Sequence, residues 1–288
     1  MIKKLLQRLK KWCVDRCVSD ERFIVSLYRK RFGKRPNLTN TVTFTEKLQW
    51  LKLNWRPDIL TRCADKWEVR GFVSERVDLG ILKELYGLYD RPEDIDFDKL
   101  PDAFVLKVTH GWNRNIFCKN KSEFDRDGSI RLLKRDMKER HFYRHREWAY
   151  RNIVPRIICE EYLTKNGETM HEYQFYCFDG VPRIVQILDN TAREQNMFDL
   201  ELNRLDVKSF LPSLSVSIAK PALFGKMLEY TAVLSKGFPF VRVDLGYVNN
   251  RVYFSELTFY PNGGMRPFDP ESFDYLLGSY LQLPAAGS

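Results

Sequence analysis

Residues 241–264, VRVDLGYVNNRVYFSELTFYPNGG, constrain this chain more than any other segment. Two β-rich runs joined by Asn249 and Asn250, with a Pro/Gly loop after them, predict a β-hairpin. Asp244 and Glu256 lie inside these apolar runs, where an unpaired carboxylate costs several kcal/mol, so we expect a positive partner for them. Oxygen ligands without a nearby His or Cys favour Mg²⁺ over zinc.

The turn decides whether the two carboxylates share a face of the hairpin. With a two-residue turn and regular pairing, Asp244 would face Ser255, and Glu256 would lie on the opposite face. A metal site therefore requires a three-residue connection, residues 249–251, or a bulge. The alternative is an ordinary hairpin whose acids are solvated or paired with the arginines of the same strands.

Positive charge is concentrated at one end of the chain. Residues 1–35 carry twelve Lys/Arg against three Asp/Glu, a surplus equal to the net charge of +9 for all 288 residues. The body is neutral, so we do not expect a nucleic-acid-binding protein. Apolar spacing in residues 2–13 predicts an amphipathic helix. Its apolar face has two interpretations: peripheral contact with an anionic membrane, or docking on the protein's own core.

We expect a cytoplasmic protein, with the inner face of the cell membrane as the location if residues 1–35 bind lipid. No apolar run approaches the roughly 18–20 residues of a transmembrane helix, and the start lacks the apolar core of a signal peptide. The six cysteines have no C-x-x-C spacing. This pattern indicates free thiols rather than a zinc site or disulfides.

The pattern of elements changes near residue 103. Before it, residues 43–46 have the spacing of a capping box, and residues 58–75 have helical spacing. After it come six short β-rich runs: AFVLKVT, RIICEEYL, YQFYCFDG, PRIVQIL, FVRVDLGYV and VYFSELTF. The charged stretch 121–151 indicates one or two exposed helices, and residues 221–236 indicate another helix. We therefore predict an α+β fold in which two lobes hold a nucleotide between them, preceded by helices. The expected units are a basic helical segment (1–39), a helical and mixed region (40–102), the two-lobed domain (103–284) and a tail (285–288).

A phosphate-binding element is predicted in AFVLKVTHGWNRN, residues 103–115. A strand carries Lys107, and the following turn with Gly111 would let backbone N–H groups approach phosphates while the ammonium neutralises them. No Walker motif is present. Taken alone, this pattern more often means a strand lysine followed by a plain turn.

Together these residues resemble the ATP-grasp ligases. The pattern R-x-D, followed on the next strand by E-x-[N/T]-x-x-P-x-G, matches Arg242, Asp244, Glu256 and Pro261. The runs FTEKLQWLK, FVLKVTHG and SKGFPFVRVDL are similar to those of TupA-like ATP-grasp proteins of surface-polysaccharide synthesis. The resemblance covers about residues 40–284 and implies an ATP-grasp fold that binds ATP and Mg²⁺.

The resemblance also implies roles for individual residues. Lys107 would contact the α and β phosphates, Glu172 the ribose, and Arg242 a developing acyl-phosphate oxyanion. The loop over the phosphates would include His110, Gly111 and Asn113, and the adenine would meet Glu160 and the backbone of Glu161 and Leu163. Asp244 and Glu256 would hold Mg²⁺. Thr258 stands where most relatives have Asn, so Thr258, Asn262 or a water is the third ligand.

Gln174 replaces a lysine that relatives often carry, which removes one phosphate-facing charge; Arg183, Arg193 or Arg242 could compensate. The run His141–Trp148 is both basic and aromatic. It has two interpretations, an exposed helix face or a substrate site for an acidic sugar. The candidate substrate residues are Arg144, Arg146, Trp148 and Arg193. Asp65 and Lys66 resemble a D-K pair common in this family, without an assigned chemistry.

We therefore expect an ATP-dependent carboxylate-amine ligase that forms an amide through an acyl phosphate and releases ADP and phosphate. The resemblance implies surface polysaccharide or capsule synthesis, in which a small-molecule or saccharide carboxylate such as a uronic acid is joined to an amine such as an amino acid. One alternative is a glycosyltransferase using a sugar nucleotide, with D-x-D at residues 94–96 or 96–98. Another is a catalytically silent ATP-grasp scaffold in capsule assembly.

Overall fold

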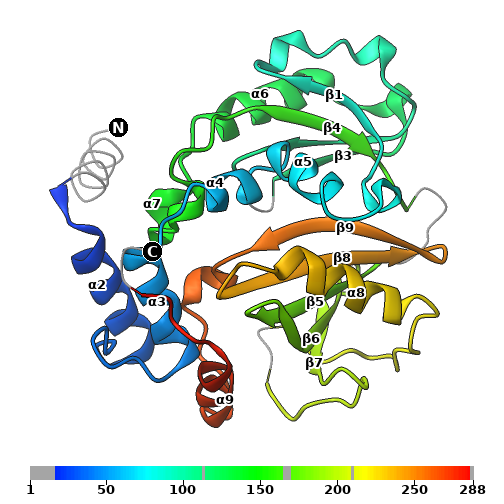
Figure 1. The fold of residues 1–288 in the computed structure, drawn as a ribbon. Coiled ribbons are helices and arrows are strands. Elements are labelled where there is room, and N and C mark those ends of the chain that lie inside the picture. Colours follow the sequence, from blue (N-terminus) through cyan, green and yellow to red (C-terminus); the bar gives the residue numbers. More distant parts are fainter. Residues whose placement is uncertain (1–16, 112–113, 165–169, 209–210, 286–288) are drawn as a thin grey trace.

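Two antiparallel sheets form the centre of the molecule (Figure 1). The structure is a computed structural model that describes residues 17–111, 114–164, 170–208 and 211–285. Sheet A has the strand order β1-β4-β2-β3, and sheet B has the order β7-β6-β5-β8-β9. The strands are β1 Leu85–Tyr89, β2 Phe104–Val108, β3 Asn115–Cys118, β4 Ile157–Glu161, β5 His171–Phe178, β6 Val181–Asp189, β7 Glu194–Phe198, β8 Phe240–Val248 and β9 Arg251–Thr258.

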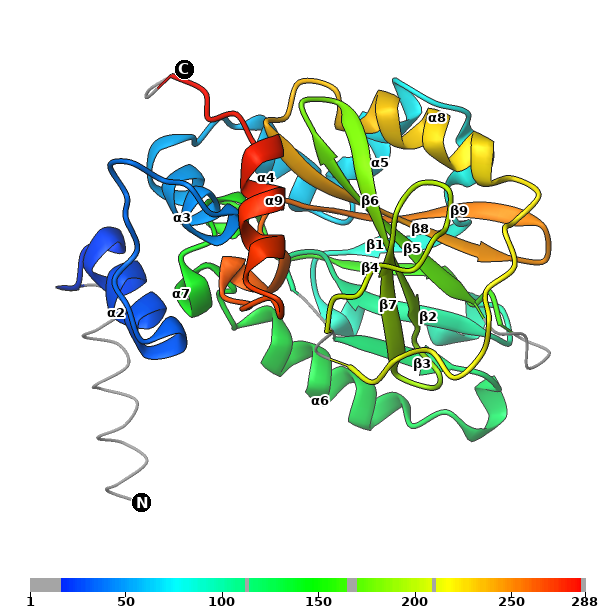
Figure 2. The ribbon, with the colours of Figure 1, turned by 90° about the horizontal axis from the view of Figure 1, so that it is seen from below.

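Helices gather at the N-terminal side and on the outer faces of the sheets (Figures 1 and 2). The α-helices are α2 Asp20–Phe32, α3 Phe44–Asn54, α4 Ile59–Ala64, α5 Glu68–Ser74, α6 Arg126–Met137, α7 Phe142–His145, α8 Phe224–Ser235 and α9 Ser272–Tyr280. The short 3₁₀ turns are η1 Leu79–Ile81, η2 Pro92–Asp94, η3 Phe97–Lys99, η4 Lys121–Glu123, η5 Trp148–Tyr150 and η6 Pro261–Gly264. The predicted α+β class is confirmed. The amphipathic pattern of residues 2–13 lies outside the described residues.

Helix α3 begins with the predicted capping box. The Thr43 hydroxyl accepts a hydrogen bond from the Glu46 N–H at 3.3 Å, and the Glu46 carboxylate accepts one from the Thr43 N–H at 3.4 Å. The helix predicted over residues 58–75 is interrupted and becomes α4 and α5. Asp65 causes the break, because its carboxylate accepts a hydrogen bond from the Trp67 N–H at 2.7 Å and so satisfies the start of α5.

Side-chain alternation gives sheet A one apolar and one charged face. Leu106 on β2 and Cys159 on β4 pack with Leu133 of α6, which covers the outer face. Lys107 and Glu160 are the next residues along these strands and therefore point to the inner face, toward sheet B. Strand β1 lies before residue 103, where the nucleotide domain was expected to begin, so sheet A also includes part of the preceding segment.

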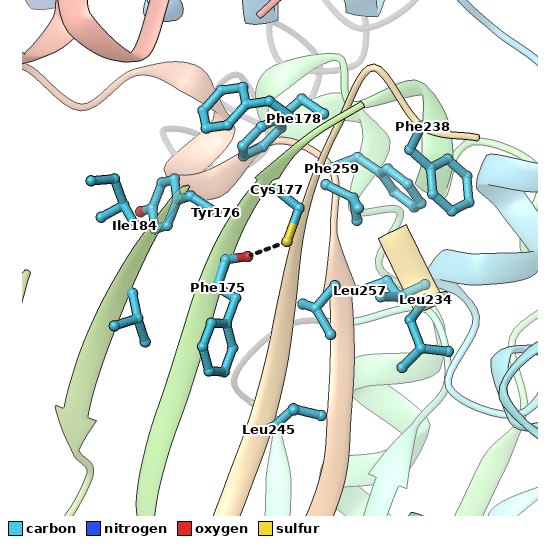
Figure 3. Close-up of a cluster of buried hydrophobic side chains, with 14 of the residues drawn as sticks. Phe175, Tyr176, Cys177, Phe178, Ile184, Leu234, Phe238, Leu245, Leu257 and Phe259 are labelled. Atoms are coloured by element: carbon cyan, nitrogen blue, oxygen red, sulfur yellow. Dashed lines mark hydrogen bonds between the residues drawn. The ribbon is translucent and has the colours of Figure 1, made fainter. Parts of the chain in front are cut away.

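Sheet B is divided in the same way. Phe175, Cys177, Leu245 and Leu257 from β5, β8 and β9 pack with Leu234 of α8 in the main hydrophobic core (Figure 3). The Cys177 thiol donates to the Phe175 carbonyl at 3.3 Å, which satisfies it within this core. The alternate residues of these strands include the polar Glu172, Gln174, Arg242, Asp244 and Glu256, but Tyr176, Phe178 and Phe240 on the same face belong to the main core. The polar part of this inner face is therefore available for a site.

Helix α9 approaches the start of α3 through a glycine, and Figure 2 shows the two helices side by side. A Cβ atom at Gly278 would lie 2.2 Å from the Val42 carbonyl oxygen and 2.9 Å from the Phe44 nitrogen. Gly278→Ala is therefore expected to lower the free energy of unfolding by about 2–3 kcal/mol, measured by urea denaturation. Gly225→Ala in α8, where a Cβ has no neighbour within 4 Å, is the control. Equal urea midpoints for the two variants would contradict this packing.

Candidate nucleotide and metal site

Lys107 and Glu160 meet on the inner face of sheet A. The Lys107 Nζ lies 2.7 Å from the Glu160 Oε2, and only 16% and 9% of their side chains are exposed. Burial alone would raise the pKa of Glu160, but Lys107, Lys83 and Arg70 lower it to about 2. Glu160 is therefore an ionised carboxylate surrounded by cations.

Lys83 lies beside this pair, just before β1. It is 9% exposed, and within the described ranges no hydrogen bond or ion pair joins its ammonium to another residue. Arg70 donates to the Lys83 carbonyl at 2.9 Å and reaches Glu160 at 3.4 Å, which fixes the backbone of Lys83 next to the pair. Burial, reinforced by Lys107, lowers the pKa of Lys83 to about 8. A buried ammonium in this state favours the arrival of an anion.

Lys66 occupies the break between α4 and α5 and reaches the loop after β2. Its Nζ donates to the Gly111 carbonyl at 2.7 Å. Burial lowers the pKa of Lys66, and the Glu256 carboxylate of sheet B opposes this shift. Lys66 thus lies within electrostatic reach of both sheets and tethers the loop that was expected to cover phosphates.

His110 supports the base of this loop and does not face outward from it. The ring is buried, its Nε2 lies 2.8 Å from the Glu139 carbonyl oxygen, and burial lowers its pKa. The His110 ring joins the loop to the end of α6, and the cover of phosphates by this loop stays a prediction. Arg114 adds ion pairs to Asp136 and Glu139. Asn113 lies outside the described residues.

A bulge brings the two predicted metal carboxylates together on the hairpin of β8 and β9. Asn249 and Asn250 form a two-residue turn with φ of 51° and 55°, the left-handed values of a type I′ turn. The register then shifts at Ser255, so Asp244 pairs directly with Glu256. Of the two connections predicted, the bulge is correct and the three-residue turn is wrong.

Arg242 holds Asp244 in a bidentate ion pair. Its Nε and one terminal nitrogen lie 2.7 and 2.5 Å from the two carboxylate oxygens. Burial would lower the pKa of Arg242, but Asp244 raises it above its ordinary value, so the guanidinium stays charged. Thr258 joins this group: its hydroxyl accepts from Arg242 at 3.2 Å and donates to Glu256 at 3.0 Å.

The hairpin offers a donor set that fits a hard cation. Across the residues that the structure describes, no group of three or more His, Cys, Asp or Glu is arranged for a metal, so the set is Asp244 and Glu256 with the Thr258 hydroxyl. Burial opposes ionisation of Glu256, but Lys66 and then Arg242 lower its pKa below the ordinary value. Two carboxylates with further oxygen atoms suit Mg²⁺, which retains waters and substrate phosphates as its other ligands. Asn262 lies exposed in η6.

Polar side chains of β5 continue this face of sheet B. Gln174 pairs in register with Asp244, donates to Glu172 at 3.1 Å and accepts from Gln186 at 3.0 Å. Burial, reinforced by Glu256, raises the pKa of Glu172. A neutral amide network therefore occupies the place where relatives often carry a lysine. The cations that oppose the raised pKa of Glu172 are Arg242 of the same sheet and Lys83, whereas Arg183 stacks 5.4 Å from the Tyr280 ring of α9.

The residues predicted to bind adenine differ in whether their backbone groups are already hydrogen-bonded. The Glu161 N–H donates to the Glu84 carbonyl at 3.0 Å, so it is used within sheet A. Leu163 follows the end of β4, and no hydrogen bond joins its backbone to another described residue. Beside it on the inner face lies a small apolar cluster, separate from the main core, of Ala103, Val105 and Tyr162.

The acceptor-binding expectation fails for Arg146. This side chain is 1% exposed, its guanidinium lies 4.5 Å from the centre of the Phe23 ring, and its Nε lies 3.5 Å from the Asp20 carboxylate. These contacts dock α2 on the body of the protein. Arg146 therefore stabilises packing and is not presented on an open surface.

Trp148 also takes part in packing. Its ring lies between two guanidinium groups, 4.5 Å from that of Arg56 and 5.0 Å from that of Arg151. Arg144 is exposed on α7, and Arg193 is exposed in the turn between β6 and β7. The basic and aromatic run is thus mainly an internal cation–aromatic cluster, and the roles of Arg144 and Arg193 remain predictions.

The inner faces of two antiparallel sheets, one carrying Lys107 and the other the Asp244–Glu256 pair, define a nucleotide-gripping protein of the ATP-grasp class. The chain belongs to the TupA-like ATP-grasp family, whose profile matches residues 46–282. No curated protein matches the sequence.

Solved structures similar to this chain are ATP-grasp ligases. They include the D-alanine–D-alanine ligase from Bacillus anthracis (20% identity, 68% of this chain, 57% of that chain, TM-score 0.42). The corresponding ligase from Helicobacter pylori (13%, 76%, 61%, 0.46) and the ligase PsnB complexed with its minimal precursor (12%, 74%, 60%, 0.40) are also similar. The chain spans less than two thirds of the length of each of these ligases.

Proposed function

We propose that this protein is an ATP-dependent carboxylate-amine ligase that releases ADP and phosphate. The observation that supports the proposal is that two charged groups lie on the inner faces of the two sheets. Lys107 and Glu160 form the group on sheet A, and Arg242, Asp244 and Glu256 form the group on sheet B. The first neutralises phosphate oxygens, and the second provides acidic ligands for a cation together with a donor for an oxyanion. Lys66 is electrostatically coupled to both groups.

ATP would lie between the sheets with its base at the end of β4. The apolar cluster of Ala103, Val105 and Tyr162 supports the base, and the backbone beyond Glu161, at Leu163, remains available for its edge. Glu172 accepts from the ribose hydroxyls. The phosphates would then meet Lys107, Lys66 and Lys83, which together replace the charge lost at Gln174. Glu160 is less suited to the adenine amine, because Lys107 already binds its Oε2.

The chemical step requires no protein nucleophile. A substrate carboxylate attacks the γ-phosphorus of ATP, ADP leaves, and the resulting acyl phosphate is attacked by an amine to give the amide and phosphate. Mg²⁺ held by Asp244 and Glu256 would supply charge neutralisation on the phosphate oxygens. Arg242 donates to the developing oxyanion.

The substrates are proposed from the family: a uronic acid or another saccharide carboxylate, and an amino acid, joined during assembly of a cell-surface polysaccharide. No described helix is long and apolar enough to cross a bilayer. We propose cytoplasmic action, with residues 1–35 as the segment that reaches the inner membrane face. Part of that segment already docks on the protein, because α2 buries Ile24 and Tyr28 against Met265.

The two rival functions make different use of ATP. A glycosyltransferase would need its D-x-D motif, yet Asp94 pairs with Arg91, and Asp96 caps η3 and pairs with Lys99, all on the surface. A silent scaffold is favoured by Thr258 and Gln174, where the sequence departs from the residues that most relatives carry.

Calorimetric titration with Mg-ATP and with UDP-sugars tests the proposal, followed by a screen of acids and amines for ADP release. Binding of UDP-sugars without ATP would favour the transferase, and ATP binding without turnover the scaffold.

The buried ammonium of Lys83 predicts a pH dependence of ATP affinity. Lys83 is charged below its pKa of about 8 and loses this charge as the pH rises, so Mg-ATP binding is expected to weaken between pH 7 and 9.5. Lys83→Met should weaken binding about tenfold at pH 7 and remove this slope. Calorimetry over this range is the measurement, with Lys99→Met, at an exposed position, as the control. An unchanged slope in Lys83→Met would exclude Lys83 from the phosphate site.

A further inference from the structure

Tyr150, the last residue of η5, has a hydroxyl group that is open to a ligand. Its side chain is partly exposed, and across the residues that the structure describes no hydrogen bond or ion pair engages the hydroxyl oxygen. This oxygen is not enclosed, unlike the Trp148 Nε1 two positions earlier, which is buried and has no hydrogen-bond partner. A half-buried phenol without an acceptor is a donor that a ligand can engage.

Packing places η5 beside the strand that carries Glu256. Helix α4 contacts both η5 and β9 and so bridges them. His145, five positions before Tyr150, lies against the loop after β9, where a Cβ atom at Gly263 would come within 2.6 Å of its ring. The buried ammonium of Lys52 joins the same two segments, because it donates to the His145 carbonyl at 3.0 Å and to the Gly263 carbonyl. The segment with Tyr150 is therefore fastened to the end of the β8–β9 hairpin.

The charged groups that act most strongly on Tyr150 include those of the proposed catalytic centre. Burial raises the pKa of Tyr150 well above its ordinary value, Glu256 and then Glu147 reinforce the shift, and Arg242 opposes it. Asp244 is a further contributor. Tyr150 thus remains a neutral donor at physiological pH, within electrostatic reach of the residues proposed to hold the cation and the oxyanion.

The ring of Tyr150 is held in place by residues that precede it in the chain. The His141 ring meets it edge to face, with the two ring centres 4.6 Å apart. The Nε2 of His141 in turn lies 3.6 Å from the Glu147 carboxylate. The Tyr150 N–H donates to the Glu147 carbonyl at 3.1 Å, which fixes the backbone. The hydroxyl therefore needs little ordering when it meets an acceptor.

We propose that the Tyr150 hydroxyl binds the reacting carboxylate of a uronic acid substrate beside Arg242. In the phosphorylation step one carboxylate oxygen forms the new bond to the γ-phosphorus of ATP, and the bond from that phosphorus to the ADP oxygen breaks. The other carboxylate oxygen accepts the hydrogen bond from Tyr150 and becomes the carbonyl oxygen of the acyl phosphate. A neutral donor suits this place, because an ammonium would withdraw more charge from the attacking oxygen. This inference rests on the proposed ligase function and adds a substrate-binding residue to it.

The test varies the acid at saturating Mg-ATP with the full chain. Glucuronate and galacturonate are the acids, hydroxylamine is the amine that traps the acyl phosphate as a hydroxamate, and ADP release is the readout. Tyr150→Phe removes only the hydroxyl and is expected to lower kcat/KM for the acid about 10–100-fold, with a higher KM. The affinity for Mg-ATP, measured by calorimetry, should stay within about twofold of the wild-type value. Tyr275→Phe, at an exposed position of α9, is the control.

The outcomes separate this inference from the ligase proposal. A wild-type kcat/KM in a folded Tyr150→Phe protein would overturn the inference only. An equal loss of Mg-ATP affinity, or a lower midpoint of urea unfolding, would also overturn it, because Tyr150 would then act in nucleotide binding or in packing. Mg-ATP binding by the wild-type protein without ADP release from either acid would remove uronic acids as substrates, and with them this role of Tyr150. Failure of the wild-type protein to bind Mg-ATP would instead contradict the proposed function itself.

Discussion

Glu256→Gln is expected to reduce acid- and amine-dependent ADP release at least about 100-fold. The side chain keeps its size and can still accept the hydrogen bond from Thr258, but it loses the charge that Lys66 and Arg242 stabilise. Its strand partner Asp244 would then be the only carboxylate of the proposed cation site. ADP release by a coupled assay, and the Mg²⁺ dependence of ATP binding by calorimetry, measure the two consequences.

The control for this experiment is Glu229→Gln, an exposed carboxylate on α8 that pairs with Lys226. This variant should turn over at the wild-type rate. Thermal unfolding of both variants checks that the fold is intact. A folded Glu256→Gln protein with normal turnover and a normal Mg²⁺ response would remove the hairpin carboxylates from the mechanism.

Much of the fold follows from local patterns in the sequence. Six of the strands were expected because β-branched and aromatic residues recur between turn residues, and the predicted β8–β9 hairpin shows the Asn-Asn turn directly. The strands that were missed lack this signal. In β1 the run LYGLY is interrupted by Gly87, β3 has only four residues, and β7 contains the polar run Glu194–Asn196.

The site residues that belong to a short sequence motif were predictable. Asp244 and Glu256 stand out because carboxylates are rare in apolar strands, and the bulge at Ser255 was one of two ways to align them. The convergence of Lys66 and Lys83 on Lys107 was not predictable. They precede it by 41 and 24 positions in the chain, and only tertiary structure brings them near: the Lys66 N–H donates to the Thr109 carbonyl just after β2, and Lys83 lies just before β1 of sheet A.

The run from His141 to Trp148 had two interpretations, an exposed helix face or a substrate site, and the structure adds a third, internal packing. Its basic and aromatic composition resembles a ligand-binding surface, yet the same side chains stack on one another and on α2. Composition alone does not distinguish a guanidinium that is open to a ligand from one that packs on aromatic rings.

Lys107→Met is expected to lower turnover about 100-fold by removing a phosphate-neutralising charge. It should also lower the free energy of unfolding by about 1–3 kcal/mol, because Glu160 loses its partner at 2.7 Å. This loss of unfolding free energy is at or below the low end of the usual cost of breaking a buried ion pair. The reason is that Arg70 and Lys83 still stabilise the ionised Glu160. Urea unfolding and ADP release measure the two effects on the same protein.

The double variant Lys107→Met with Glu160→Gln separates the two roles of Lys107. The double variant has no unpaired buried carboxylate, because both charges are removed. Its free energy of unfolding should therefore return toward the wild-type value while turnover stays low. Glu160→Gln alone calibrates what the loss of that carboxylate does to activity. Recovery of turnover together with stability would mean that Lys107 serves only to hold Glu160, and the phosphate-binding role would then pass to Lys66 and Lys83, the other cations near this pair.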